Sequence, residues 1–116
     1  MDKALKPNAI DDIRSYIAAL DAAGELHRIT AEVDWNYELC HISKVNEEQK
    51  GPALLYENVK DNTIPVFTSA FTTKERLAIA LEQDTSLTMS ELSQKWMELT
   101  TQGLIPPEYI EDDIPV

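Results

Sequence analysis

The stretch Gly51–Lys60, which reads GPALLYENVK, decides the fold of this chain. Its first two residues, a glycine and a proline, end any helix that precedes them. The residues that follow are mostly apolar and include leucine, tyrosine and valine, which predicts a strand over Ala53–Val59. The elements on either side are expected to pair with this strand or to pack on it.

A second strand is predicted directly after the first. The polar residues Lys60–Thr63 indicate a turn, and the strand pattern resumes over Ile64–Thr68. A connection this short favours an antiparallel hairpin within residues 53–68. Pro65 has no backbone N–H to donate, so the second strand is expected at an edge of the sheet.

Upstream of the hairpin, a helix and a strand are predicted. Apolar residues at Leu39, Ile42 and Val45 follow helical spacing, and the polar residues 46–50 close this helix before the glycine–proline break. Further back, Leu26–Val33 is rich in β-branched residues and reads as a strand with imperfect alternation.

The chain opens with another predicted helix. Asp11 and Asp12 offer an N-cap, and Gly24 follows the apolar pattern as a C-cap. The apolar positions recur at helical spacing: Ile13, Tyr16, Ile17 and Leu20.

Two more helices are predicted downstream, each with a capping-box signature at its start. The first begins at Thr72 with its partner at Glu75, and its apolar residues Leu77, Ala78 and Leu81 predict burial between two layers. The second begins at Thr88 with its partner at Glu91, ends before Gly103, and has one apolar face, formed by Leu92, Trp96 and Leu99.

Together these elements predict an α/β (α+β) fold in which about four helices pack on one face of a small sheet. Residues 1–103 would form this domain. Residues 104–116 carry three prolines and four acids but no base, a composition that disfavours both helix and packed strand. An acidic, proline-containing connector or tail is therefore predicted there.

The charge balance limits the classes of partner. The chain has 21 acidic and 10 basic residues, a net charge of −11, which would repel a phosphate backbone. Nucleic acid is therefore not expected as a partner. No apolar run is long enough for a membrane span or a signal peptide, so a cytoplasmic location is expected.

A search for reactive groups yields no candidate catalytic, cofactor-binding or metal-binding residue. His27 and His41 lack a second ligand at a chelating spacing, since Cys40 and His41 are adjacent and point in different directions on a helix. Cys40 is expected in or near the core. Trp35 and Trp96 are expected as packing anchors. All three glycines fall at predicted helix ends, which leaves none for a phosphate-cradling loop.

The chain resembles the amino-terminal part of the UbiD family, the carboxy-lyases typified by 3-polyprenyl-4-hydroxybenzoate decarboxylase. The most specific element is GPALLYENVK itself. The resemblance also covers the segments at 11–34, 64–81 and 106–116, which read DDIRSYIAALDAAGELHRITAEVD, IPVFTSAFTTKERLAIAL and PPEYIEDDIPV. Trp35 and Asn36 depart from the Asp-Pro-like residues common in the family, and Ser69 stands where an asparagine is usual.

The resemblance implies a (de)carboxylase for aromatic or α,β-unsaturated acids that uses prenylated FMN, a manganese ion and a potassium ion. In the family the residues that bind these groups, and the Glu-Arg-Glu catalytic set, belong to a central domain that would begin after Val116. No residue of this chain matches those motifs. The resemblance thus implies a truncated, inactive scaffold domain or small subunit whose partner is a UbiD-type catalytic chain, or which self-associates. The alternative is a free-standing protein-interaction module.

Overall fold

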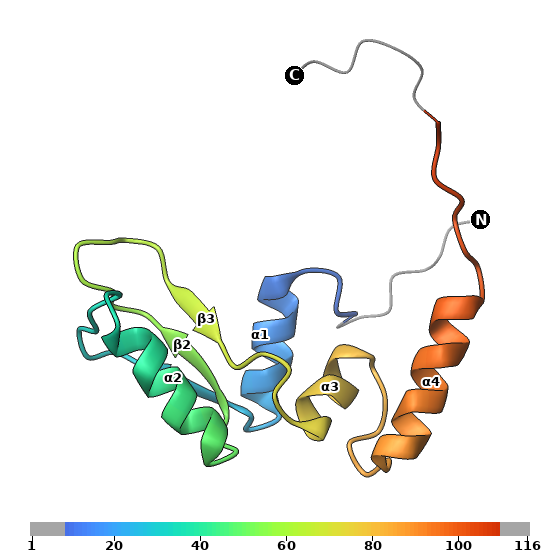
Figure 1. Ribbon diagram of the computed structural model, residues 1–116, viewed down its shortest axis with the longest axis horizontal. Coiled ribbons are helices and arrows are strands. Elements are labelled where there is room, and N and C mark those ends of the chain that lie inside the picture. The colour runs from blue at the N-terminus through green and yellow to red at the C-terminus, as the bar shows by residue number, and fades with distance from the viewer. Residues whose placement is uncertain (1–8, 110–116) are drawn as a thin grey trace.

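The computed structural model describes residues 9–109 and shows the expected α+β fold (Figure 1). The described chain contains four helices and a small mixed sheet of three strands. In chain order the elements are α1 (Ile13–Ala22), β1 (Leu26–Ile29), α2 (Glu38–Glu48), β2 (Ala53–Tyr56), β3 (Val66–Thr68), α3 (Lys74–Ala80) and α4 (Met89–Thr101).

The predicted hairpin is present, with shorter strands than the sequence suggests. β2 is the central strand, parallel to β1 and antiparallel to β3, with Leu55 opposite Phe67. β3 is an edge strand, as predicted, but it starts at Val66, just after Pro65, and not at Ile64. The strand predicted over Leu26–Val33 ends at Ile29, and strand pairing returns only as a single bridge between Val33 and Val59.

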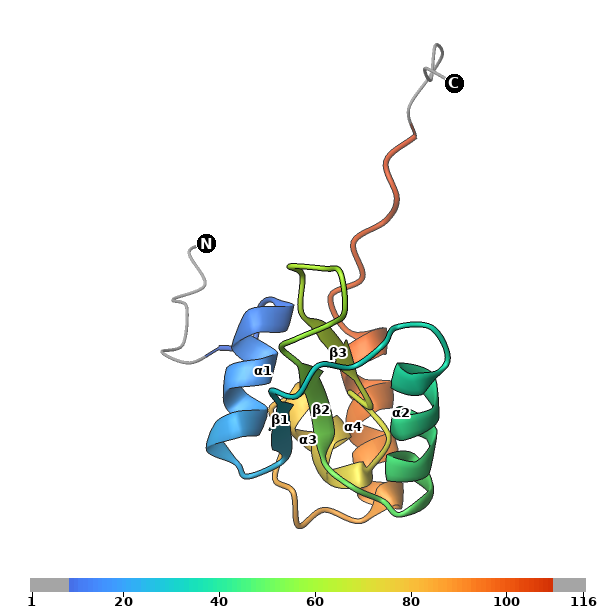
Figure 2. The same cartoon turned by 90° about the vertical axis from the view of Figure 1, so that its left-hand side faces the viewer.

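Helices cover both faces of the sheet, so the prediction of one covered face is wrong (Figure 2). Successive side chains of β2 point to opposite faces: Leu54 packs with Leu39 of α2, whereas Ala53 packs with Leu20 of α1. All four residues of β2 are buried. Parallel strands need a crossover connection, and α2 provides it on one face while α1 covers the other.

A chain of buried hydroxyl groups ties α2 to the sheet. The Ser43 hydroxyl lies 2.8 Å from the Tyr56 hydroxyl and 2.9 Å from that of Thr68. The Tyr56 hydroxyl also donates to the backbone carbonyl of Leu39 at 3.2 Å. Because buried polar groups are costly when unpaired, this network fixes how α2 sits on the sheet.

The helix starts are largely as the sequence predicts. Asp12 caps α1, and hydrogen bonds from the backbone and side chain of Ser15 hold the pKa of the Asp12 carboxyl below its usual value. Thr88 and Glu91 form the predicted capping box of α4. Gly24, just after α1, has a φ of +74°, which a glycine adopts without strain.

The start of α3 is a correction. Thr73, not Thr72, caps this helix, its hydroxyl accepting from the backbone N–H of Arg76 at 3.3 Å. No capping box forms, because the third helical residue is then an arginine, which cannot accept a hydrogen bond. The hydroxyl of Thr72 accepts instead from the guanidinium of Arg76.

The prediction that α3 is buried between two layers is right only for Ala78, because Leu77 and Leu81 are only partly buried. The helix packs on α1 and lies between α1 and α4 (Figure 1).

Cys40 is a further correction, because it is exposed on α2, whose buried side chains are Leu39 and Ser43. The predicted tail is described only over residues 104–109, which are exposed and have no regular structure; residues 110–116 lie outside the described part.

No helix within residues 9–109 has both the length and the apolar character that a bilayer span requires.

Candidate functional site

An apolar groove between α3 and α4 is the most distinctive surface feature of the described chain. It has a volume of about 420 Å³. Leu92, which is 1% exposed, forms its floor. The lining consists of Leu77 and Leu81 from α3 and of Met89, Leu92, Ser93, Trp96 and Met97 from α4.

Local interactions set the width of this groove by holding the connection between the two helices. The ammonium of Lys74, at the start of α3, donates to the backbone carbonyls of Thr85 at 3.1 Å and Leu87 at 2.7 Å. Within the connection, the Asp84 carboxylate accepts from the backbone N–H of Ser86 at 2.8 Å and from its hydroxyl at 2.7 Å. These bonds lower the pKa of Asp84 and keep its side chain charged.

Helix α4 is poorly covered by the rest of the described chain. Leu92 is the only buried residue among its thirteen. Trp96 and Met97 are 52% and 61% exposed, so the expectation that Trp96 anchors the packing of this domain is wrong. A helix of this length is marginal without tertiary packing, and an exposed apolar face of this kind commonly marks an interaction surface.

A second opening lies at the other end of the molecule, beside the hairpin loop. Its volume is about 570 Å³, and polar side chains such as Asp61 and Asn62 contribute to its lining with Trp35 and Ile64. Trp35 is 59% exposed, which also corrects its predicted role as a packing anchor. It lies on the loop that leads into α2. That loop and α4 are at opposite ends of the molecule (Figure 1).

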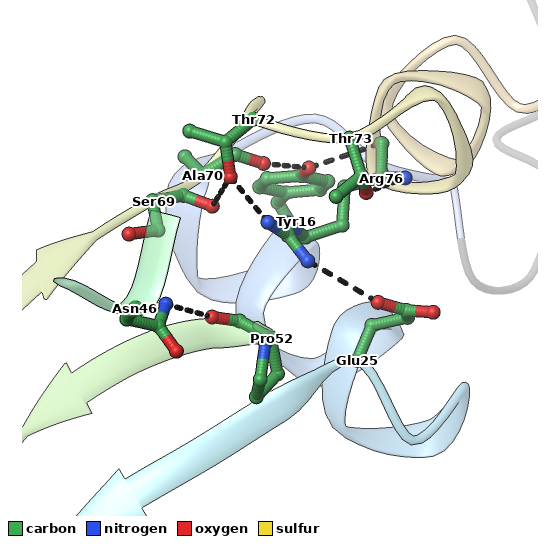
Figure 3. Close-up of polar contacts among 9 residues, drawn as sticks. All are labelled: Tyr16, Glu25, Asn46, Pro52, Ser69, Ala70, Thr72, Thr73 and Arg76. Carbon is green, nitrogen blue, oxygen red and sulfur yellow. Dashed lines mark hydrogen bonds and ion pairs between the residues drawn. The ribbon is translucent and has the colours of Figure 1, made fainter. Parts of the chain in front are cut away.

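A buried polar cluster connects α1, β1 and α3, and Figure 3 shows its contacts. Arg76 of α3 is fully buried, and its Nη1 lies 3.3 Å from the Glu25 carboxylate. Arg76 Nε has no hydrogen-bond partner within the described residues. Because this guanidinium is enclosed by the protein, it offers no free edge to a ligand. We assign the cluster a structural role.

The Tyr16 hydroxyl belongs to the same cluster. It lies 2.7 Å from the carbonyl oxygen of Ala70 and 3.0 Å from that of Arg76, and donates its single proton between them. Burial is the main reason that the pKa of Tyr16 is raised to about 12. At neutral pH this phenol is therefore a hydrogen-bond donor and not a base.

The described residues do not fit a metal ion. No group of three histidine, cysteine, aspartate or glutamate side chains comes together anywhere in residues 9–109. His27 lies on β1 and His41 on α2, and both are exposed. The sequence search proposed no metal, catalytic or cofactor-binding residue, and Cys40, like the two histidines, lies at the surface.

The α3–α4 groove does not fit a flavin phosphate either. Ser93 is the only polar side chain in the α3–α4 groove. Gly51 is needed for packing, since a Cβ there would collide with the Asn46 side chain, whose amide donates to the Pro52 carbonyl at 2.8 Å (Figure 3). A phosphate needs converging N–H donors or cations, which this groove lacks.

Three comparisons relate the chain to known proteins. Residues 17–96 match the family model described as the 3-octaprenyl-4-hydroxybenzoate carboxy-lyase N-terminal domain, UbiD_N. The uncharacterized protein sll0936 of Synechocystis sp. is 39% identical over 103 residues, which are 89% of this chain but 20% of that protein.

Solved structures of vanillic acid decarboxylase from Sedimentibacter hydroxybenzoicus share the fold. The open form superposes with a TM-score of 0.67 at 21% identity, over 78% of this chain and 19% of that one. The open form with a truncated second component gives 0.71 at 20% identity, over 85% and 21%. The chain therefore spans about a fifth of the length of each of these relatives.

Proposed function

The chain belongs to the UbiD carboxy-lyase family, because it matches the amino-terminal domain of that family. We propose that it is a non-catalytic scaffold of a UbiD-type (de)carboxylase. In this role it would support a catalytic part that lies outside these 116 residues. The proposal covers both a domain of a longer chain and a separate small subunit.

One observation carries the proposal. The match to the Synechocystis relative takes in 89% of this chain but only 20% of that protein, so nearly the whole chain corresponds to a small part of a larger one. The exposed apolar groove between α3 and α4 supports this reading. A domain that normally packs on a larger body exposes an apolar surface when that body is absent.

The chemistry is assigned to the complete enzyme. By family membership, that enzyme would act on aromatic or α,β-unsaturated acids with prenylated FMN, manganese and potassium, in the cytoplasm and as an oligomer. The residues of this chain would contribute no atom to the reacting centre. Their role would be to stabilise the fold of the catalytic domain.

A chimera tests the proposal. This chain replaces the 103 matching residues of the Synechocystis protein, whose unaltered full-length form is the folding control. We expect a soluble chimera that retains flavin under conditions where the control retains it. A chimera that is insoluble or free of flavin, beside a well-folded flavin-containing control, would contradict the scaffold role.

The isolated chain provides a second test. We expect it to be colourless and inactive on aromatic and acrylic acids after incubation with prenylated FMN, manganese and potassium. Stoichiometric flavin binding would contradict a non-catalytic role. A chain that fails in the chimera, yet captures an unrelated protein through α4, would favour the alternative of a free-standing interaction module.

A further inference from the structure

We propose that the groove between α3 and α4 is the surface by which the catalytic part of the UbiD-type enzyme holds this domain, with Trp96 at the centre of the contact. The inference rests on the proposed function. It adds the place of contact and the chemistry of the occupant, which is an apolar segment of the catalytic part.

The distribution of exposed apolar side chains supports this place. Seven of the thirteen large exposed hydrophobic residues in the described chain fall within the last 21 described residues, so the uncovered apolar surface is concentrated there. They are Met89, Trp96, Met97, Leu99, Leu104, Ile105 and Tyr109. Such a concentration marks an interface, whereas single exposed apolar residues elsewhere need no partner.

The lining of the groove indicates the kind of occupant. Leu77 and Leu81 form one wall, Trp96 and Met97 belong to the other, and Leu92 closes the floor. The groove is open to solvent, and its volume of about 420 Å³ leaves room for apolar side chains of a partner. Tryptophan and methionine are enriched at the centres of protein interfaces, and methionine adapts to the shape of an apolar partner.

The route of the chain points to the catalytic part as that partner. Residues 104–109 leave directly from the end of α4, beside the groove. In each relative, about four fifths of the protein lies outside the segment that matches this chain. Where the catalytic part continues the same chain beyond α4, it reaches the groove at a high effective concentration, so a modest apolar contact is enough to hold the two together.

Charge argues against a second copy as the occupant. Each chain carries a net charge of −11, so two copies repel one another as they approach. A dimer held by this groove would have to overcome that repulsion mainly through apolar contacts. Lys95 of α4 is already paired with Glu98 of the same helix.

Oxidation of methionine side chains measures whether the groove is covered. Met97 and Met89 are both more than half exposed in the free chain, and peroxide converts exposed methionine to the sulfoxide, which mass spectrometry locates by residue. We expect Met97 to be oxidised at least about tenfold more slowly in the chimera than in the free chain. Amide exchange over α4 should slow by a similar factor.

Two matched variants assign any protection to the groove. Trp96→Ala should return the oxidation rate of Met97 in the chimera to that of the same variant as a free chain. Trp35→Ala removes a tryptophan of similar exposure at the other end of the molecule and should leave the protection unchanged. Comparing each variant with its own free chain removes any effect on α4 itself.

The contrary outcomes are distinct. Equal oxidation of Met97 in a soluble, flavin-containing chimera and in the free chain overturns the inference while the scaffold role stands. Protection that survives Trp96→Ala overturns it as well. A third outcome is that the free chain sediments as a dimer in which Met97 is protected from oxidation, and that Trp96→Ala dissociates this dimer. In that case a second copy of the chain occupies the groove, and the proposal is wrong.

Discussion

The guanidinium of Arg76 is fully buried, and its ionic partner 3.3 Å away, the carboxylate of Glu25, is partly exposed, with 31% of its side chain accessible. The two residues lie 51 positions apart and connect α3 to the start of β1. The cost of separating them is therefore asymmetric. Losing Glu25 leaves a cation enclosed in the protein, whereas losing Arg76 leaves a carboxylate that water can reach.

Substitution of this pair should reveal that asymmetry. We expect Glu25→Ala to lower the free energy of unfolding by about 2 kcal/mol, less than a fully buried pair would lose because water already reaches the glutamate. Adding Arg76→Met should restore at least half of the loss, because an apolar side chain of similar length removes the enclosed charge. Urea denaturation of the two variants at pH 7 measures this. A double variant less stable than Glu25→Ala would contradict the argument.

The phenol of Tyr16 should make stability fall in alkali. Its pKa is about 12 in the folded chain against 10.0 when unperturbed, so the unfolded state loses its proton first. The stabilisation is complete below pH 10 and is lost as pH rises toward 12, at no more than about 1.4 kcal/mol per pH unit. Denaturant titrations at pH 9, 10 and 11 measure the slope.

Tyr16→Phe is the matched control for that slope, because it keeps the ring but removes the titrating group. We expect it to cost about 1–2 kcal/mol at pH 7, since the carbonyls of Ala70 and Arg76 lose their donor. Its stability should then decline less steeply above pH 10 than that of the parent chain. Identical slopes would assign the alkaline effect to lysines or to other tyrosines.

Ser69 has a φ of +61°, a left-handed conformation that asparagine and glycine adopt more readily than serine. Its hydroxyl donates to the Glu47 carboxylate at 3.1 Å. We expect Ser69→Ala to be the least stable variant, because it keeps the strain and loses the bond. Ser69→Gly should be more stable than Ser69→Ala by about 1 kcal/mol, because only the bond is lost. Ser69→Asn should be at least as stable as serine, and thermal unfolding of the series gives the order.

Leu55 and Leu77 should respond differently to a charge. Leu55 is buried in the central strand, so Leu55→Asp is expected to cost several kcal/mol, on the order of 4, and to unfold the free chain. Leu77 is only partly buried at the wall of the groove, so Leu77→Asp should be tolerated better in the free chain. Thermal unfolding followed by circular dichroism compares the two variants. Equal destabilisation would mean that Leu77 is already buried within the free chain.

Much of the local structure follows from short-range chemistry. The hairpin, the caps at Asp12 and Thr88 and the breaks at Gly24 and Gly51 each depend on residues a few positions apart, so the sequence predicted them correctly. The family was also evident from the sequence, because GPALLYENVK and its flanking segments occur in the order and spacing typical of that family. That this chain carries no flavin or metal constellation remains a prediction.

Other features depended on contacts between distant segments. The cap of α3 moved to Thr73 because the hydroxyl of Thr72 is used by Arg76, which Glu25 in turn draws toward β1. Coverage of both sheet faces follows from the parallel pairing of β1 with β2, since the crossover through α2 occupies the second face. Local patterns cannot show which distant strand becomes the neighbour.

The sequence by itself determined where α1 and α4 begin, where the hairpin turns and to which family the chain belongs, because those depend on local backbone preferences and on motif order. Only the tertiary structure decided that Trp35 and Trp96 stay half exposed, and that α4 buries Leu92 alone. The physical reason is that an apolar pattern shows which face of a helix is stabilised by burial, whereas the three-dimensional packing decides whether other residues of this chain bury that face.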